Sequence, residues 1–210
     1  MIDLKGEPKY VRPDEVEAVK KVISPIIEKR AIAGICLYGS RVAGYAKADS
    51  DYDVLIVIEE YRPLVRYKYL QDEVSVSALL VDAKALKDDA EKAKLGEFVV
   101  GRLLNIYEPI YGAEYLRRVE VLYKKRVILE ALKCLASTYG ELSTILQIEP
   151  EYFLFDKLKK RAAIYPPALY SYVKTYSEPN SARNLEATLK GFKEALHVES
   201  RFGAEAVVTP

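Results

Sequence analysis

Apolar residues in the first half of the chain follow two different spacings. From residue 13 to residue 30, valines and isoleucines recur at helical spacing and Pro13 suits a first helical turn, so we predict an amphipathic helix there. Three later runs are apolar but only of strand length: 31–38, 51–58 and 74–81. The second of these runs is apolar on both faces, which is typical of a strand in the middle of a sheet. Residues 83–95 return to helical spacing.

The second half of the chain has helical spacing and almost no strand signals. The apolar positions from Ala113 to about Leu146 predict one long helix with a possible break at Gly140. Residues 168–176 and 182–197 predict two further helices. The pattern therefore changes from mixed to helical part-way along the chain.

This change of pattern indicates two domains. Residues 108–112 have the composition of a loop, so we predict one domain at 1–112 and a second at 113–210. Because the strands are confined to the first domain, the expected fold class is α+β. It would comprise a mixed sheet flanked by helices, followed by an all-helical C-terminal domain.

The net charge of the chain conceals a division between its two halves. The formal charge is +1, from 32 basic and 31 acidic residues, which argues against a generally basic nucleic-acid binder. Before Tyr115 there are 17 basic and 20 acidic residues, whereas from there on there are 15 and 11. The first half is therefore acidic and the second half is basic.

Composition restricts the possible metal sites and the compartment. Cys36, Cys134 and the only histidine, His197, are too few and too far apart for a disulfide framework or a zinc site, so any metal would bind to oxygen. The aliphatic stretch at 54–58 is far shorter than the ~20 residues that span a bilayer, and residues 1–5 lack the apolar block of a signal peptide. We therefore expect a cytoplasmic protein that does not bind membranes. Scarce Gln and Asn beside abundant Lys and Glu match proteins that work at high temperature.

The most informative stretch is residues 37–57. Its pattern predicts a strand, a turn at Gly39-Ser40, a short helix, a loop and a second strand that begins with Asp51 and Asp53. Because side chains alternate along a strand, the two aspartates share a face, roughly 6.6 Å apart along the chain. Carboxylates so placed repel each other unless a cation lies between them, and hard oxygen ligands suit Mg²⁺. Glycine lets the backbone approach a phosphate closely, and Ser40 supplies a hydroxyl group.

This stretch resembles the signature of the nucleotidyltransferase superfamily, the DNA polymerase beta-like group that includes minimal and aminoglycoside nucleotidyltransferases. The family pattern is an apolar residue, Gly-Ser, a short spacer and Asp-x-Asp before an apolar strand. Ten residues, 41–50, form the spacer between Ser40 and Asp51 here. The resemblance covers roughly residues 15–85. It implies a nucleotidyltransferase-like sheet in the first domain and does not identify a substrate.

The resemblance also implies roles for individual residues. Gly39 and Ser40 would hold the terminal phosphates of a nucleoside triphosphate, with ATP as the expected substrate, and Asp51 and Asp53 would bind two Mg²⁺ ions. Arg41 matches a frequent basic residue of the family and would reach the triphosphate; the alternative is an ordinary exposed helical residue. Nucleotide binding is thus assigned to the turn and metal binding to the following strand.

The family usually takes a third carboxylate from the next strand, where it activates the attacking hydroxyl. In this chain residues 73–82 carry serines where an acid is expected. Glu73 shares a face with Ser75 and Ser77, so we predict it as the third catalytic carboxylate beside the aspartate pair. Glu97, in another element, is the alternative.

The basic second half suggests a platform for an acceptor substrate. Positive side chains follow a phosphate backbone and tyrosine rings stack on bases, so RNA is one possible acceptor. The alternative is that the charges form solvated helix faces and the tyrosines pack inside a helical bundle. The basic residues form two clusters, Arg117, Arg118, Lys124, Lys125 and Arg126, and Lys157, Lys159, Lys160 and Arg161, and the second precedes Tyr165, Tyr170, Tyr172 and Tyr176.

Two functions follow from these features. The first is a Mg²⁺-dependent nucleotidyltransferase that moves a nucleoside monophosphate from a triphosphate to an acceptor hydroxyl by two-metal catalysis. The second is a nucleotide-binding regulatory module, including an antitoxin-like partner protein, that lacks turnover because the third carboxylate is missing.

Overall fold

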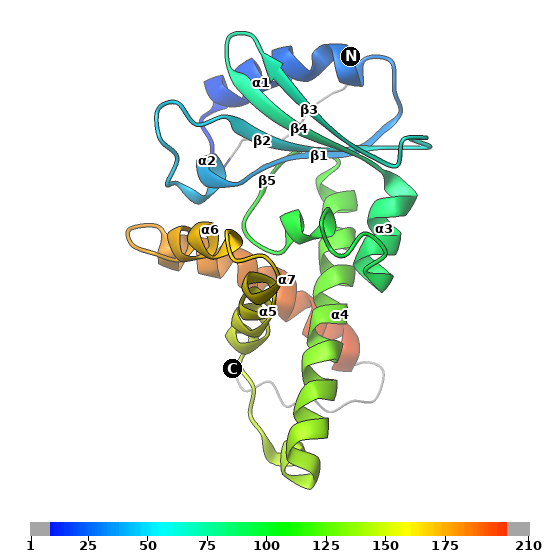
Figure 1. The fold of residues 1–210 in the computed structure, drawn as a ribbon, viewed down its shortest axis with the longest axis vertical. Coiled ribbons are helices and arrows are strands. Elements are labelled where there is room, and N and C mark those ends of the chain that lie inside the picture. The colour runs from blue at the N-terminus through cyan, green and yellow to red at the C-terminus, as the bar shows by residue number, and fades with distance from the viewer. Residues whose placement is uncertain (1–8, 201–210) are drawn as a thin grey trace.

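The computed structural model describes the backbone of residues 9–200 and the side chains to residue 197. A five-stranded sheet with the strand order β3-β4-β2-β1-β5 lies at one end of the molecule (Figure 1). The strands are β1 (Ile32–Tyr38), β2 (Tyr52–Ile58), β3 (Val65–Gln71), β4 (Ser75–Asp82) and β5 (Glu108–Tyr111). β2 and β4 are parallel and the other neighbours are antiparallel, so the sheet is mixed, as expected.

The three strands predicted from apolar runs are β1, β2 and β4, which form the middle of the sheet. The two strands that the pattern did not predict, β3 and β5, are its edges. β3 carries exposed residues such as Arg66 and Tyr69 because one side of an edge strand faces solvent. In β5, Pro109 gave the segment the composition of a loop, but an edge strand tolerates proline. The expected loop at 108–112 is therefore wrong for its first four residues, which pair with β1.

Helices cover both faces of the sheet (Figure 1). α1 (Pro13–Ile27) covers one face, in a core cluster with Val54 and Ile56 of β2. Leu55 and Val57, on the opposite face, belong to a second cluster with α3 (Ala83–Lys92) and the 3₁₀ helix η1 (Val100–Leu103). The alternation of buried residues along β2 thus separates two cores, as expected for a central strand.

The C-terminal part is helical, as predicted. Its elements are α4 (Ala113–Tyr139), η2 (Gly140–Ile145), α5 (Pro150–Ile164), α6 (Ala168–Thr175) and α7 (Ser181–Ser200). The long helix ends at Gly140, whose φ of 55° lies in the left-handed region, so the predicted break is confirmed. α5 was not predicted, because its charged residues obscure the apolar positions.

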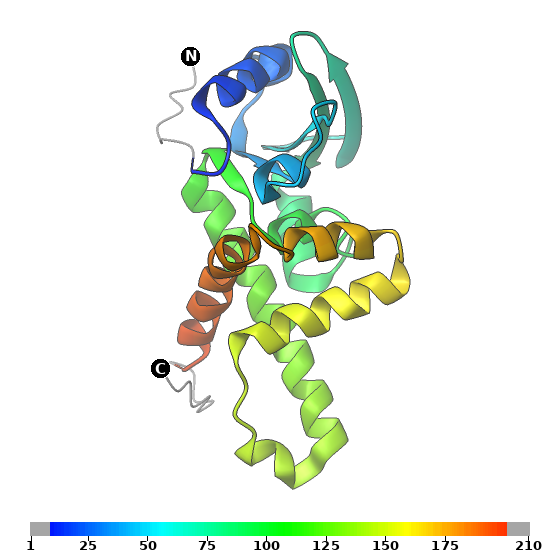
Figure 2. The same ribbon diagram turned by 90° about the vertical axis from the view of Figure 1, so that its left-hand side faces the viewer.

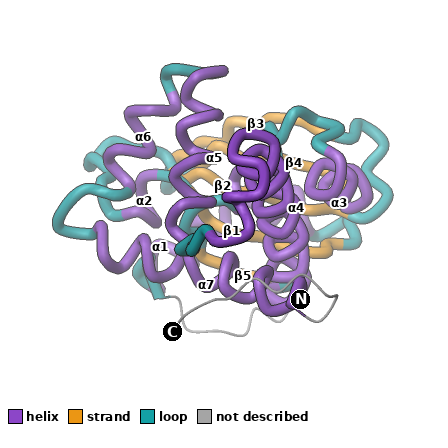
Figure 3. The backbone as a smooth tube through the Cα atoms, turned by 90° about the horizontal axis from the view of Figure 1, so that it is seen from below, coloured by secondary structure: helices purple, strands orange, loops and turns teal. Residues whose placement is uncertain are grey.

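The helical part packs directly against the sheet. One buried cluster contains Leu55 of β2 together with Leu116 of α4, Phe153 of α5 and Phe192 of α7. In Figure 2, α5 and α6 project to one side of α4, and α6 lies below α2 (Ser40–Ala43). Figure 3, seen from below, shows the C-terminal helices α4 and α5 in front of the strands. The division at residue 112 stays a prediction, and a continuous core crosses it.

Among the described helices, none combines the length and the apolar character needed to cross a membrane.

Candidate functional site

The turn between β1 and α2 brings the backbone against a carboxylate. Gly39 has a φ of 78°, and a Cβ atom at this position would lie 3.1 Å from Asp53 Cγ and collide with its carboxylate oxygen. Only glycine fits this conformation and this close approach. The predicted Gly-Ser turn and the predicted aspartate strand therefore meet in space, through the antiparallel pairing of Tyr38 with Asp53.

The C-terminal end of α2 is held by the beginning of α7. Arg183 donates a hydrogen bond of 2.9 Å to the carbonyl of Val42, and Asn184 donates one of 2.9 Å to the carbonyl of Ala43. These bonds satisfy carbonyl groups that a helix end leaves without intrahelical partners. The position of Ser40, at the other end of this short helix, therefore depends on the C-terminal half.

Asp51 and Asp53 are both half-buried, and a serine lies beside them. Ser77 of β4 pairs with Asp53 in the sheet, and its hydroxyl donates a short hydrogen bond to Asp51 Oδ2. Burial, reinforced by the charge of Asp51, raises the pKa of Asp53 to about 6, although the positive charge of Arg102 opposes the rise. Ser77 thus stands on the strand from which the family's third carboxylate is expected.

Glu73 does not join this pair. It lies in the turn before β4, and its side chain is 59% exposed. Its Oε2 atom lies 3.5 Å from Lys21 Nζ. Lys21 belongs to α1, which covers the face of the sheet opposite to the aspartate pair. Among the described residues there is no group of three acidic, histidine or cysteine side chains that could hold a metal ion. The geometry therefore brings together two of the three predicted carboxylates.

Arg41 is engaged within its own loop. Its guanidinium donates to the carbonyls of Ala48 and Ser50, at 3.2 and 2.5 Å, and lies 4.5 Å from the centroid of the Tyr52 ring. It also lies 3.8 Å from a carboxylate oxygen of Glu15. These contacts make Arg41 a support for the loop that leads to Asp51.

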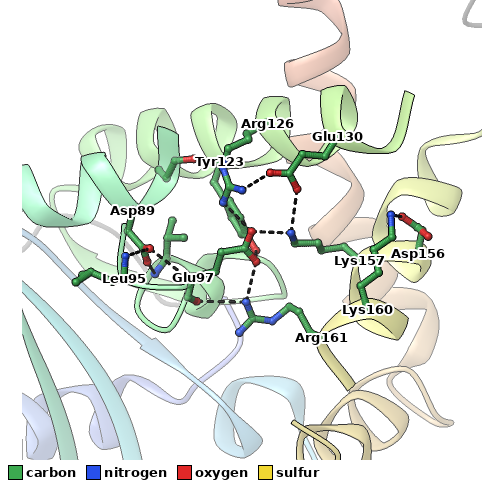
Figure 4. Close-up of polar contacts among 12 residues, drawn as sticks. Asp89, Leu95, Glu97, Tyr123, Arg126, Glu130, Asp156, Lys157, Lys160 and Arg161 are labelled. Carbon is green, nitrogen blue, oxygen red and sulfur yellow. Dashed lines mark hydrogen bonds and ion pairs between the residues drawn. The ribbon is translucent and has the colours of Figure 1, made fainter. Parts of the chain in front are cut away.

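Glu97, the alternative third carboxylate, is the centre of an ion-pair network (Figure 4). Its buried carboxylate accepts hydrogen bonds from Arg126, Lys157 and Arg161, at 2.8, 2.6 and 3.1 Å, and from Tyr123 at 3.0 Å. Burial would raise the pKa of Glu97, but the hydrogen bonds and charges of Lys157 and Arg126 outweigh it, and the pKa is lowered. Glu97 therefore connects the segment after α3 to α4 and α5.

Several of the predicted residues border one large cleft between the sheet and the C-terminal helices. Its volume is about 1060 Å³. The first wall includes Gly39, Ser40 and Asp53, and the opposite wall consists of residues from α5, α6 and the turn between them. The basic residues that line it are Lys47, Arg102, Lys157, Lys160 and Arg161, and the acidic ones are Asp53 and Glu97. Among the charged residues of the lining, next to the Gly-Ser turn, the basic ones therefore outnumber the acidic ones.

The two basic clusters of the second half have different positions. In the first, Arg117, Lys124 and Arg126 pair with buried glutamates, so these three residues stabilise the helical core. In the second, Lys160 borders the cleft, together with Tyr165 and Tyr170, which are 64% and 61% exposed. Of the two clusters, the second is therefore the one that lies beside exposed tyrosine rings in the cleft.

The sequence patterns did not indicate Arg102, which borders the cleft and whose positive charge opposes the rise in the pKa of Asp53. A lone arginine between Gly101 and Leu103 carries no motif, and its position follows only from the packing of η1 against the sheet. No sequence signal identified it.

Comparison with known proteins agrees with this geometry. Residues 20–105 match the family model described as Polymerase beta, Nucleotidyltransferase. This nucleotidyltransferase domain extends from within α1 to just beyond η1 and contains both the Gly-Ser turn and the aspartate pair. The resemblance predicted from the motif is thereby confirmed for this part of the chain.

A solved structure, a nucleotidyltransferase-like protein from Exiguobacterium sibiricum 255-15, shares 12% identity with the chain. The match covers 92% of this chain and 78% of that one, with a TM-score of 0.38. The sequence matches none of the curated proteins.

Proposed function

We propose that the protein is a Mg²⁺-dependent nucleotidyltransferase that transfers a nucleoside monophosphate from a triphosphate, with ATP as the expected donor, to an acceptor hydroxyl. The observation that carries the proposal is the contact between the Gly39 backbone and the Asp53 carboxylate at the wall of a basic cleft. A turn that would bind phosphate thus lies directly beside a carboxylate that would bind a metal ion, which supports phosphoryl chemistry at this point.

The residues fit a divalent cation through their donor chemistry. Asp51 and Asp53 supply hard carboxylate oxygens. Burial, and after it the charge of Asp51, raises the pKa of Asp53, and a cation bound there would stabilise the ionised carboxylate. Mg²⁺ held there would neutralise the charge that develops on the transferring phosphate. The described residues offer two grouped carboxylates. The phosphates of the nucleotide would therefore supply the remaining metal ligands, both for this ion and for the second ion that the family resemblance implies.

The chain's own residues would position the reactants. Gly39 lets the β- and γ-phosphates approach the backbone, and Ser40 would donate its hydroxyl to them. The acceptor hydroxyl would attack the α-phosphate in line, forming a new P–O bond while the bond to pyrophosphate breaks. Holding both reactants in the cleft reduces the entropic cost of their encounter.

The acceptor would bind against the α5–α6 wall. Tyr165 and Tyr170 expose their rings there and Lys160 adds a positive charge, which supports an acceptor with aromatic bases and phosphates, such as RNA. A labelled RNA that cross-links to this wall would support the assignment, whereas transfer only to small hydroxyl compounds would contradict it.

Transfer of α-labelled nucleotide tests the activity itself. We expect Asp51→Asn and Asp53→Asn to lower transfer at least ~100-fold, because each removes a carboxylate from the metal site. Asp72→Asn is the matched control, since Asp72 lies exposed in the turn between β3 and β4. Full transfer by both site variants would contradict the proposal.

A second function is favoured by one observation. Ser77 occupies the strand position beside Asp53, and Glu73 lies elsewhere, so the described residues provide no third carboxylate to activate the hydroxyl. A regulatory module that binds nucleotide without turnover, including an antitoxin-like partner protein, would retain the turn and the aspartates. Mg²⁺-dependent binding of ATP without transfer to any RNA or small hydroxyl acceptor would support it, and measurable transfer would exclude it.

A further inference from the structure

Arg102 is held in place by a buried carboxylate. Asp89, fully buried at the end of α3, accepts hydrogen bonds from the backbone N–H groups of Leu95, Glu97 and Val100, at 2.8, 3.0 and 3.1 Å. These bonds order the segment that leads into η1, the helix that carries Arg102. The position of η1, and with it of the Arg102 backbone, therefore depends on these bonds.

Among the described side chains, the guanidinium of Arg102 lacks the carboxylate partners that Lys157, Lys160 and Arg161 have. Its Nε is the one buried side-chain nitrogen or oxygen without a hydrogen-bond partner between residues 9 and 197. Lys157 and Arg161 pair with Glu97, and Lys160 pairs with Asp156 at 2.6 Å.

Two aromatic rings lie next to the Arg102 guanidinium. Its Cζ lies 5.3 Å from the ring centroids of both Tyr38 and Phe98. Leaving a buried donor unpaired opposes folding, so a group kept in this state is best explained by a ligand that pairs with it.

We propose that Arg102 binds the phosphates of the nucleoside triphosphate, an inference that rests on the proposed function. Arg102 and Asp53 border the same cleft as the Gly-Ser turn, so a nucleotide held by that turn would carry its phosphates past the guanidinium. A planar guanidinium donates two parallel hydrogen bonds to a phosphate, which the two aromatic rings cannot accept. The rings instead restrict the orientation of the guanidinium before the ligand arrives.

Binding rather than turnover is the decisive measurement. Isothermal titration would compare wild type, Arg102→Gln and Arg102→Lys with three probes: ATP with Mg²⁺, inorganic tripolyphosphate with Mg²⁺, and adenosine. We expect Arg102→Gln to weaken the binding of ATP and of tripolyphosphate about 10- to 100-fold and to leave the affinity for adenosine unchanged. Arg102→Lys should be intermediate, because it keeps the charge but not the planar group. Arg66→Gln on edge strand β3 is the matched control.

Thermal unfolding separates a binding role from a structural one. Because the guanidinium has no hydrogen-bonded partner to lose, Arg102→Gln should unfold at the wild-type temperature or above it. Unchanged affinity for tripolyphosphate, an equal loss for adenosine, a markedly lower unfolding temperature in both variants, or no binding of either phosphate probe to wild type would overturn the assignment. If phosphate binding depends on Arg102 but the protein transfers no nucleotide, the assignment of Arg102 is supported and only the transferase proposal is contradicted.

Discussion

At the scale of single residues, the site consists of charges in unusual surroundings. Asp53 is half-buried beside Asp51 and against the Gly39 backbone, and Ser77 supplies a hydrogen bond to the pair in place of a third charge. Arg102 adds a positive charge that nothing in the described part of the chain pairs with by a hydrogen bond. Such unfavourable local arrangements are typical of sites that bind ligands, because the ligand supplies the missing partners.

Asp53 predicts how stability depends on pH in metal-free protein. Its pKa is about 6 when folded, above its ordinary value of 3.8, so its contribution to stability is present below pH 4 and is lost as the pH rises through 6. Asp53→Asn should therefore raise the free energy of unfolding by about 2 kcal/mol at pH 7.5 and change it little at pH 3.5.

Urea denaturation at these two pH values, without and with Mg²⁺, measures this effect. We expect Mg²⁺ to stabilise wild type and to leave Asp53→Asn unaffected, because the variant lacks one carboxylate ligand. An equal change at both pH values would show that ionisation of Asp53 is not the cause.

At the scale of elements, short segments position the chemical groups. The four-residue helix α2 presents Ser40 and is held at its other end by α7. The segment between α3 and η1 contains Glu97 and Phe98. Three of its residues, Ala93, Gly96 and Glu97, have a positive φ. Segments of this kind need bonds from outside themselves, and here Asp89 provides them.

Asp89→Ala tests this dependence. Three buried N–H groups would lose their acceptor, so we expect the free energy of unfolding to fall by about 3–5 kcal/mol. Chemical denaturation measures the loss, and Asp88→Asn is the control because its ion pairs lie at the surface. An effect no larger than that of the control would show that the segment is held by its other contacts.

At the scale of the whole molecule, the cleft exists because two parts of the chain meet. The sheet supplies the Gly-Ser turn and Asp53, and the C-terminal helices supply the opposite wall. Glu97 joins them, since its carboxylate binds Arg126 of α4 and both Lys157 and Arg161 of α5 (Figure 4). The arrangement of the two walls is thus determined by a buried charge network as well as by apolar packing.

Glu97→Gln should weaken this connection. The change leaves three cations around a neutral amide, so we expect a loss of about 3 kcal/mol at pH 7. Because the pKa of Glu97 is lowered, its contribution is present above pH 4.5 and is lost as the pH falls below that value, so the difference from wild type should shrink at pH 3. Chemical denaturation at both pH values measures it, with exposed Glu114→Gln as the control. A loss at pH 3 as large as that at pH 7 would contradict an ionic origin.

The sequence by itself predicted what depends on neighbours along the chain. The central strands β1, β2 and β4 could be predicted because burial on both faces leaves continuous apolar runs. The Gly-Ser turn and the aspartate pair could be predicted because they lie on two adjacent strands with a short connection. The edge strands β3 and β5 and the charged helix α5 could not be predicted. Their residues are partly buried and partly exposed, and which of them are buried depends on the elements that pack against them.

Only the tertiary structure determined which partners the charged side chains contact. Glu73 and Glu97 were both candidate carboxylates by sequence, yet one pairs with a surface lysine and the other with three cations from distant helices. Arg41 supports a loop, whereas Arg102, which carried no motif, faces the cleft without a hydrogen-bonded partner. The physical reason is that the free energy of a charge depends on which groups surround it, and packing brings those groups together from positions up to 64 residues apart in the sequence.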